Sequence, residues 1–173
     1  MSINQDRIKP VKLVIFDVDG VLTDGRIVLD DNGLESKFFN VRDGSGLKWL
    51  KRAGIEIAFL TGRESRAVKH RAEELGVNIV RQGAKVKLPV YEEILNELNL
   101  TDRETAFAGD DLIDLPVLRR VGLAMAPADA SPEVKEAAHY VCGCGGGQGA
   151  VREMAEMILK GQGHWEKITA GYF

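Results

Sequence analysis

Three groups of polar side chains follow short apolar runs in this 173-residue chain, namely those at Asp17, Thr61 and Asp110. Apolar runs of this kind are typical of buried strands of a parallel sheet, whose carboxyl ends meet at one edge where ligands bind. Carboxylates gathered there repel one another unless a cation holds them, and oxygen ligands favour a hard ion. The spacing therefore predicts a Mg²⁺ site with a hydroxyl and the guanidinium of Arg63 beside it.

Strand-like and helix-like segments alternate along the whole chain. Asp30-Asp31-Asn32-Gly33 has the composition of a hairpin turn. We predict an α/β fold, a Rossmann-like three-layer sandwich with a mostly parallel sheet, in one domain over 1–173, with a hairpin insertion over about 25–41 and a tail over about 161–173. The predicted strands cover 11–16, 26–29, 35–40, 55–60, 78–80, 105–108, 123–125 and 140–141, and the predicted helices cover 44–53, 64–75, 86–98, 112–121, a segment from 131, and 149–159.

The hairpin, a helix and a strand already fill the roughly forty residues between Asp19 and Thr61. A further βα repeat fills the segment between Thr61 and Asp110, so we expect no cap domain over the site. Association of subunits is the expected substitute for a cap. Aromatic residues in the tail, among them Trp165, Tyr172 and Phe173, are expected to dock on a neighbouring subunit.

Composition narrows the class of protein and its partners. The net charge is -3 and the pI is near 5.7. Because the chain has no excess of basic residues, we expect no nucleic-acid or anionic-membrane partner. No apolar run reaches the length of about twenty residues that a membrane span needs, and the N-terminus lacks the apolar stretch of a signal peptide. The two cysteines, Cys142 and Cys144, are interpreted as free thiols. These features predict a cytoplasmic enzyme.

A calcium-binding loop is the other metal site that Asp17-Val18-Asp19-Gly20 could suggest. An EF-hand loop needs a preceding helix, glycine at its sixth position and glutamate at its twelfth. Here a predicted strand precedes the segment, Leu22 is the sixth residue and Val28 the twelfth. The calcium loop is therefore excluded.

Four motifs in order resemble the haloacid dehalogenase superfamily over roughly 11–159. They are Phe16-Asp17-Val18-Asp19-Gly20 with the residues to Gly25, then Leu60-Thr61-Gly62-Arg63, then Lys87, then Gly109-Asp110-Asp111-Leu112-Ile113-Asp114. The resemblance implies that Asp17 attacks phosphorus to form an aspartyl phosphate, and that Asp19 is the general acid and base.

The same resemblance implies roles for the remaining motif residues. Thr61 and Lys87 would bind and neutralise the transferring phosphoryl group. Asp17, Asp110 and Asp19, the last through its backbone carbonyl, would hold the cofactor Mg²⁺. Asp111 or Asp114 would orient the water ligands of the ion and Lys87.

Within the superfamily the chain resembles the capless group of 3-deoxy-D-manno-octulosonate 8-phosphate phosphatases, through Thr23-Asp24-Gly25, 39–44 and 145–153. This implies a phosphatase of lipopolysaccharide precursor synthesis, a homotetramer with shared active sites, and a small anionic sugar acid phosphate as substrate. Arginine suits both the phosphate and the carboxylate of such a substrate. Gln148 stands where a basic residue is expected. The predicted substrate-binding residues are Asn40, Arg42, Asp43, Gly44, Lys48, Gly62, Arg63 and Arg71.

Three alternatives compete with this interpretation. The first is a phosphatase acting on a nonulosonate 9-phosphate, against which Arg63 favours the eight-carbon acid. The second is a receiver-like phosphoacceptor module, which would carry its phosphorylated aspartate after a middle strand, whereas here that strand ends in Thr61. The third is an inactive homologue serving as a scaffold, although every expected catalytic residue is present.

Overall fold

The computed structural model describes residues 4–172. Met1 to Ile3, which belong to the predicted domain, and Phe173 of the predicted tail lie outside the described residues. No helix in 4–172 combines the length and the apolar character that crossing a membrane would require.

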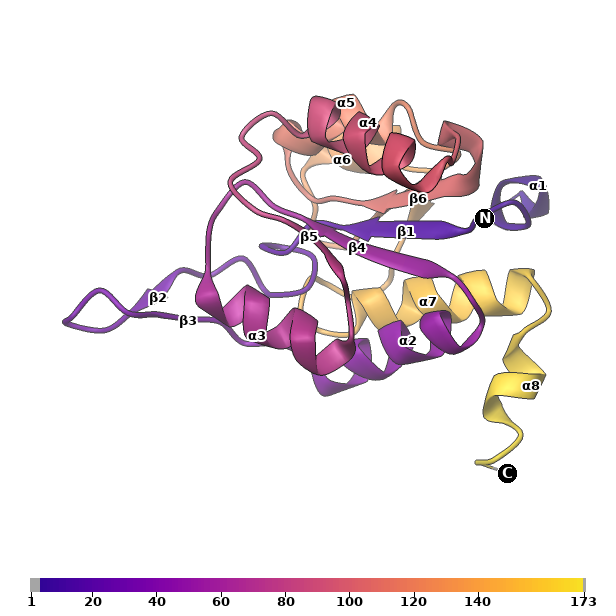
Figure 1. The fold of residues 1–173 in the computed structure, drawn as a ribbon, viewed down its shortest axis with the longest axis horizontal. Helices are drawn as coiled ribbons and strands as arrows, with labels where there is room; N and C mark the ends of the chain where they lie inside the picture. The colour runs from indigo at the N-terminus through magenta and orange to yellow at the C-terminus, as the bar shows by residue number, and fades with distance from the viewer. Residues whose placement is uncertain (1–3, 173) are drawn as a thin grey trace.

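A six-stranded sheet with the strand order β5-β4-β1-β6-β7-β8 forms the centre of the molecule (Figure 1). Every neighbouring pair of these strands is parallel, which confirms the predicted parallel sheet. β1 lies between β4 and β6, so the chain winds outward from it in both directions and leaves a crevice at the carboxyl ends. The strands are β1 (Leu13–Phe16), β4 (Glu56–Leu60), β5 (Ile79–Arg81), β6 (Thr105–Ala108), β7 (Leu123–Ala126) and β8 (Tyr140–Val141).

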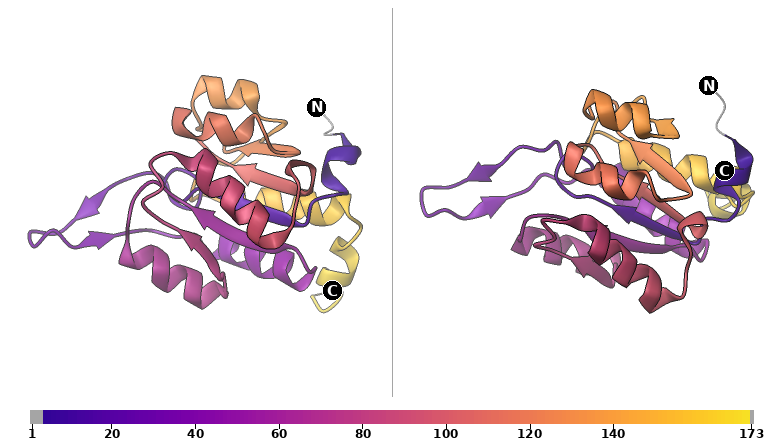
Figure 2. Two further views of the ribbon diagram at one scale, coloured as in Figure 1. Left: turned by 45° about the horizontal axis from the view of Figure 1, so that its top comes forward. Right: turned by 90° about the horizontal axis from the view of Figure 1, so that it is seen from above.

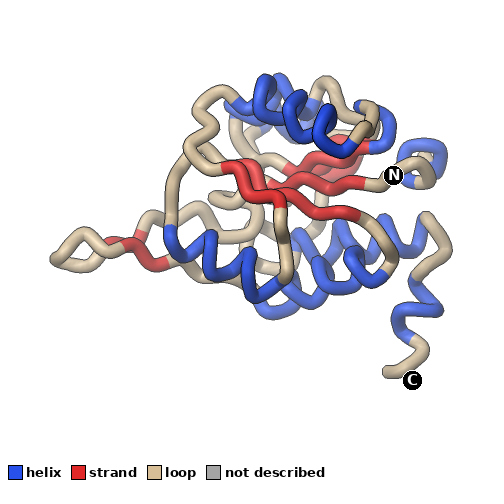
Figure 3. The backbone as a smooth tube through the Cα atoms, in the orientation of Figure 1, coloured by secondary structure: helices blue, strands red, loops and turns tan. Residues whose placement is uncertain are grey.

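Helices cover both faces of the sheet, as predicted for a three-layer sandwich (Figures 2 and 3). Side chains of β1 alternate between the two hydrophobic layers: Val14 and Phe16 belong to one core cluster, and Leu13 and Ile15 belong to the other. The first cluster lies under α2 (Val41–Arg52), α3 (Arg66–Leu75) and α7 (Ala150–Gly161), and the second under α4 (Lys87–Leu98), α5 (Leu115–Leu118) and α6 (Pro132–Ala137).

A hairpin of β2 (Val28–Leu29) and β3 (Glu35–Ser36) protrudes from the body of the molecule, at the left of Figure 1. Its turn is held by Asp30, whose carbonyl accepts from Gly33 N (2.9 Å) and whose carboxylate accepts from Leu34 N (2.7 Å). The predicted hairpin is confirmed, with strands shorter than predicted. Within 4–172, no cap domain follows either β1 or β4.

The start of α2 differs from the prediction. The predicted helix covers 44–53, but the helix begins at Val41 and Asn40 caps it by accepting from Arg42 N (2.8 Å). Asp43 instead lies buried against α7, where it accepts from Arg152 N (2.8 Å). The Asp43 carboxylate therefore satisfies a backbone donor in the first turn of α7, which has no side-chain cap of its own.

The segment predicted as one helix over 112–121 is a 3₁₀ turn, η2 (Leu112–Asp114), followed by the short α5. Asp114 turns its carboxylate back toward Asp110 N (3.0 Å) and Asp111 N (3.3 Å), which tightens this turn. A second 3₁₀ turn, η1 (Asp102–Glu104), precedes β6, and α1 (Gln5–Ile8) precedes β1. Neither was predicted.

The C-terminal tail contains α8 (Trp165–Thr169) and folds back on its own chain. The ring of Trp165 lies edge-on to Trp49 of α2, with 5.6 Å between centroids, and Tyr172 lies 6.1 Å from the same ring. Within one chain, Trp165 and Tyr172 thus pack on Trp49 while Tyr172 stays 62% exposed, and docking of the tail on a neighbouring subunit stays a prediction. Trp49 presents an aromatic surface within the same chain, and the tail covers it.

Candidate active site

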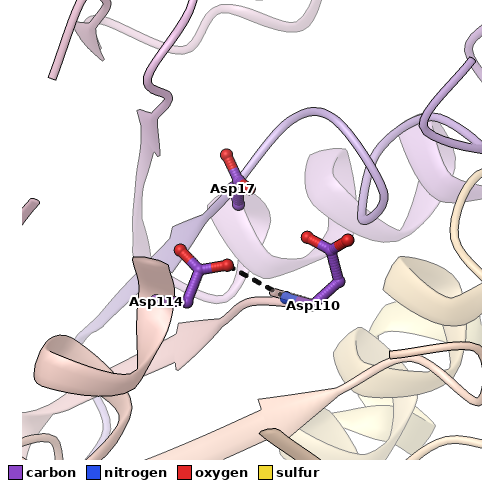
Figure 4. A group of neighbouring side chains, drawn as sticks. All are labelled: Asp17, Asp110 and Asp114. Carbon is purple, nitrogen blue, oxygen red and sulfur yellow. Dashed lines mark hydrogen bonds between the residues drawn. The ribbon is translucent and has the colours of Figure 1, made fainter. Parts of the chain in front are cut away.

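Three carboxylates, those of Asp17, Asp110 and Asp114, converge at the carboxyl edge of the sheet (Figure 4). One oxygen of each lies within 4.8 Å of the others. Asp17 directly follows β1, and its backbone N–H donates to Ala108 O (2.9 Å), which aligns the ends of β1 and β6. The strand-end rule therefore brings Asp17 and Asp110 together as predicted, with Asp114 as the third member.

Lys87 joins this cluster from the first position of α4. Its Nζ lies 2.9 Å from Asp17 Oδ1 and 2.6 Å from Asp114 Oδ1, and the residue is only 2% exposed. An ammonium held in this way between two carboxylates is fixed in position, unlike a solvated helix lysine. The predicted assignment of Lys87 to the site therefore agrees with where the structure places it.

Burial raises the pKa of Asp17 to about 7, although the charge of Lys87 opposes this and that of Asp114 adds to it. Burial likewise raises the pKa of Asp110 to about 8, with further contributions from the charges of Asp17 and Asp114. Asp110 Oδ1 is buried without a hydrogen-bond partner. The carboxylates of Asp17 and Asp110 therefore ionise together only at a cost, and one of their oxygens has no partner. Both properties fit a site for a hard divalent cation such as Mg²⁺.

A cleft of about 240 Å³ opens over the cluster. It contains seven of the predicted site residues, one glycine of the segment after β1, and Ile113. The side chains and backbone that line it belong to Asp17, Asp19, Gly25, Thr61, Gly62, Arg63, Asp110, Asp111 and Ile113. Thr61 is buried at the end of β4, and its hydroxyl faces the backbone N–H of Arg63 at 3.4 Å.

Gly20 allows the first and fourth motifs to approach each other. Its φ is +84°, a left-handed conformation that glycine adopts without strain. A Cβ at this position would lie 2.0 Å from Asp110 Oδ2. Only a glycine therefore leaves room for the Asp110 carboxylate beside the loop that carries Asp19.

The carboxylate of Asp19 lies outside the cluster of Asp17, Asp110 and Asp114. Its Oδ1 accepts a hydrogen bond from Lys37, and its Oδ2 lies 3.8 Å from Arg63 Nε. Lys37 and Arg63 thus engage the Asp19 carboxylate, and binding of the ion by the Asp19 backbone carbonyl stays a prediction.

Lys37 and Glu35 are site neighbours that sequence reasoning missed. Glu35 accepts from Arg63 Nη2 (2.8 Å) and lies 3.4 Å from Lys37 Nζ. Burial raises the pKa of Glu35, but the hydrogen bond from Arg63 and the charge of Lys37 help to hold it below its ordinary value. The sequence feature that could have indicated this pair is their separation by two residues in an extended segment. That spacing places both side chains on one side of the chain.

Comparison with known proteins then decides the family. The family model for haloacid dehalogenase-like hydrolases matches residues 41–122. The 3-deoxy-D-manno-octulosonate 8-phosphate phosphatase of Yersinia pestis is 45% identical over 159 residues, covering 92% of this chain and 85% of that protein. This chain belongs to that family of haloacid dehalogenase-like hydrolases. The corresponding phosphatase of Escherichia coli K12 is 44% identical over 88% of the chain and 81% of the relative.

Solved structures of this phosphatase family superimpose closely. A probable YrbI family phosphatase from Pseudomonas syringae has a TM-score of 0.95 at 46% identity, covering 97% of this chain and 96% of that one. A 3-deoxy-D-manno-octulosonate 8-phosphate phosphatase from Moraxella catarrhalis, solved with magnesium, phosphate and KDO, has a TM-score of 0.96 at 37% identity, covering 98% and 97%. The carboxylate cluster of this chain fits the magnesium that the phosphatase family binds.

Several predicted substrate-binding residues lie outside the cleft. Arg71 Nη2 donates to Asn40 O (3.2 Å), and its guanidinium lies 5.7 Å from the Phe39 ring. Gly44 is the neighbour of Arg71, because a Cβ on it would lie 2.3 Å from Nη2. Asn40, Gly44 and Arg71 thus form a separate cluster at the start of α2, and a single chain of this phosphatase does not bring them to the cleft.

Three further predicted substrate ligands are also absent from the cleft lining of this chain. Asp43 is committed to the α2–α7 contact, and Arg42 and Lys48 are exposed on α2. A role of these residues in substrate binding stays a prediction, and in the predicted shared site they would act with a neighbouring subunit. Asn40 instead contacts the glycine-rich loop, where its Nδ2 donates to Gly147 O (3.2 Å).

The cysteines of this phosphatase are free, as predicted. Cys142 is buried, and burial raises the pKa of its thiol. A protonated, buried thiol is a poor nucleophile and a poor metal ligand. Neither cysteine is close enough to the carboxylate cluster to be counted within it.

Proposed function

We propose that the chain is a Mg²⁺-dependent phosphatase that hydrolyses 3-deoxy-D-manno-octulosonate 8-phosphate to 3-deoxy-D-manno-octulosonate and phosphate, in the synthesis of lipopolysaccharide precursors. The observation that carries this proposal is the cluster of Asp17, Lys87, Asp110 and Asp114 in a chain 45% identical to a phosphatase of that name. The two free cysteines are consistent with the reducing cytoplasm, where we place the reaction.

In the proposed first step, a carboxylate oxygen of Asp17 attacks phosphorus, and the bond from phosphorus to the sugar oxygen breaks. Asp19 gives its proton to the departing alkoxide, so the products are the free sugar acid and an aspartyl phosphate. The position of Asp19 in the cleft lining supports this role. Lys87 lies 2.9 Å from Asp17 and would offset the negative charge gathered at the phosphoryl group.

In the second step, Asp19 takes a proton from water as that water attacks phosphorus, and the bond to Asp17 breaks. Phosphate leaves, and both aspartates return to their starting states. The hydroxyl of Thr61 would donate to the phosphoryl oxygens, and Asp114 holds Lys87 in place at 2.6 Å. Asp17, Asp110 and the Asp19 backbone carbonyl would hold Mg²⁺, which would supply positive charge beside the nucleophile.

Three alternatives are less well supported. A nonulosonate 9-phosphate would need the same chemistry, but the relatives reported above are named for the eight-carbon acid and Arg63 stands in the cleft lining. A receiver-like module or an inactive scaffold would not require a cleft beside the nucleophile. Membership of a hydrolase family, with the nucleophile, lysine and carboxylates all in place, supports an active phosphatase.

The substrate prediction is tested by phosphate release across a panel of sugar phosphates and sugar acid phosphates. We expect the highest kcat/KM for 3-deoxy-D-manno-octulosonate 8-phosphate. The Arg63→Ala variant should lose about 10- to 100-fold in kcat/KM on this substrate, because a charge-assisted hydrogen bond contributes roughly 1.5–3 kcal/mol. Its loss on p-nitrophenyl phosphate should be small, since that ester has no carboxylate to recognise.

Arg66→Ala is the matched control, because Arg66 is an exposed arginine three residues farther on at the start of α3. It should retain the activity of the unaltered chain on both esters. Equal losses on both esters for Arg63→Ala would contradict carboxylate recognition. A higher kcat/KM for a nonulosonate 9-phosphate would favour the nine-carbon alternative.

We further propose that the chain forms a homotetramer through its hairpin. Apolar side chains are exposed along the hairpin and at its exit, an unusual concentration for a monomer surface. They belong to Ile27 (57% exposed), Leu29 (57%), Leu34 (63%), Phe38 (60%) and Val41 (79%). A neighbouring subunit that covered them would also shield the cleft, which no cap domain covers in residues 4–172.

A Leu34→Asp variant is expected to weaken this association by about 10- to 100-fold, because burying a leucine contributes about 1.5–3 kcal/mol. Sedimentation velocity should show a tetramer for the unaltered chain and smaller species for the variant at the same concentration. Val141→Asp is the control, since Val141 is an exposed apolar residue on β8, away from the hairpin. An unaltered chain that sediments as a monomer would contradict the tetramer.

A further inference from the structure

Lys37 is a buried cation that the mechanism above does not use. Its side chain is only 2% exposed, although it lies in the segment that returns from a protruding hairpin. It pairs with the Asp19 carboxylate and lies 3.4 Å from Glu35 Oε1. Removing an ammonium from water costs several kcal/mol unless opposite charges hold it closely, so two carboxylates are needed to keep it there.

Lys37 is not placed to bind the substrate. The residues that line the cleft include Asp19 and Arg63 but not Lys37. Because the Lys37 side chain is almost fully covered, its ammonium reaches the cleft directly through the Asp19 carboxylate and indirectly through Glu35 and Arg63. An effect on proton transfer must therefore act through Asp19, whereas an effect through Glu35 and Arg63 would leave the leaving-group dependence unchanged.

Glu35 fixes the position of Lys37 relative to the second motif. Its Oε1 accepts from Arg63 Nη2 (2.8 Å), and Arg63 belongs to the loop that follows β4. The return segment of the hairpin is thus tied to the edge of the sheet by one ion pair. A second ion pair, from Lys37, ties it to Asp19.

The metal site would compete with Lys37 for the carboxylate of Asp19. The cluster of Asp17, Asp110 and Asp114 attracts a divalent cation, and a free carboxylate nearby would be drawn to that cation. A carboxyl group that delivers a proton must instead lie within about 2.6–3.2 Å of the leaving oxygen. Lys37 holds Oδ1 on the hairpin side, and Arg63 faces Oδ2 at 3.8 Å.

We propose that Lys37 is a positioning residue that holds the Asp19 carboxyl toward the leaving oxygen and away from the metal site. This inference rests on the proposed phosphatase mechanism. It assigns the hairpin a function within its own chain, besides any contact with a second subunit: its return segment orients the group that transfers the proton.

The test measures kcat for a series of aryl phosphates whose leaving phenols differ in acidity, and for the sugar acid phosphate. An acidic phenol such as p-nitrophenol leaves without a proton, whereas phenol and the sugar alkoxide need one. The Lys37→Met variant should lose less than about fivefold on p-nitrophenyl phosphate and about 100-fold or more on the sugar substrate, since general acid catalysis contributes about 10²–10⁴-fold. The dependence of rate on leaving-group acidity should become steeper.

A double-mutant cycle with Asp19→Asn distinguishes positioning from a general structural role. With Asp19 already replaced, adding Lys37→Met should leave the leaving-group dependence unchanged. Lys12→Met is the matched control, because it breaks an exposed lysine–glutamate pair (2.6 Å) before the start of β1 and should leave the dependence as it is in the unaltered chain.

Folding of each variant is checked by circular dichroism and thermal unfolding. Lys37→Gln, which keeps a donor but removes the charge, replaces Lys37→Met if the latter does not fold, and the same steepening is expected. Equal losses across the series, or an unchanged dependence, would overturn the inference. If the unaltered chain releases no phosphate from any ester, the proposed function fails instead, so the two failures are distinguishable.

Discussion

The Asp17→Asn variant is expected to lose at least about 10⁴-fold in kcat on every phosphate ester, because the amide cannot displace the leaving group to form the aspartyl phosphate. The loss should not depend on leaving-group acidity, which separates Asp17 from Asp19. Phosphate release measures the rate. Brief mixing of the unaltered chain with labelled substrate, followed by acid quench, should trap label on the protein, and the variant should carry none.

The thermal stability of the Asp17→Asn variant provides the control for the loss of activity. Burial raises the pKa of Asp17 to about 7, so ionised Asp17 is disfavoured in the folded chain without metal. Asparagine has the same shape and no charge, and the variant should unfold at the same temperature as the unaltered chain or higher, measured without metal at pH 8. Asp31→Asn, in the exposed hairpin turn, should leave kcat unchanged. Substantial turnover by Asp17→Asn would contradict its role as the nucleophile.

Sequence reasoning recovers those parts of the molecule that local pattern determines. Buried strands of a parallel sheet are continuous apolar runs, so β1, β4 and β6 are visible, and the strand-end rule then selects Asp17, Thr61 and Asp110. Lys87 could not be found from its spacing alone. Its distinguishing property is that it is buried between two carboxylates, and burial depends on how α4 packs against the sheet end.

The missed contacts come from chain paths that spacing does not encode. Lys37 reaches Asp19 only because the hairpin returns across the end of the sheet, and no periodicity fixes that path. Arg71 lies two turns along α3 from the second motif, yet its guanidinium turns to Asn40 O and Phe39 at the start of α2. Long, flexible cationic side chains settle where acceptors and aromatic rings lie, and these belong to other elements.

Removal of the metal should abolish turnover as completely as loss of Asp17. We expect EDTA to reduce phosphate release to background and excess Mg²⁺ to restore it, because Asp17 and Asp110 cannot both ionise side by side without a cation. The readout that does not depend on activity is thermal unfolding. Mg²⁺ should raise the unfolding temperature by several degrees when its concentration exceeds the dissociation constant about 100-fold. Asp110→Asn should lose most of that shift.

The pH dependence of the rise in unfolding temperature on Mg²⁺ binding gives the sharper test. The ordinary carboxyl value here is 3.8, whereas Asp17 and Asp110 have pKa values of about 7 and about 8 in the folded chain. Between about pH 4 and pH 8 the folded chain therefore holds protons that the unfolded chain has released. Its stability without metal should fall as pH rises through that window.

Mg²⁺ and protons compete for the carboxylate oxygens of Asp17 and Asp110. The stabilising effect of Mg²⁺ should therefore grow from about pH 5.5 to about pH 8.5. Unfolding temperatures measured with EDTA and with Mg²⁺ at both pH values test this expectation. If Mg²⁺ raised the unfolding temperature equally at both pH values, the cation would not bind at these carboxylates. A larger shift at the higher pH that disappears in Asp110→Asn would instead locate the ion beside Asp17, where the proposed mechanism requires it.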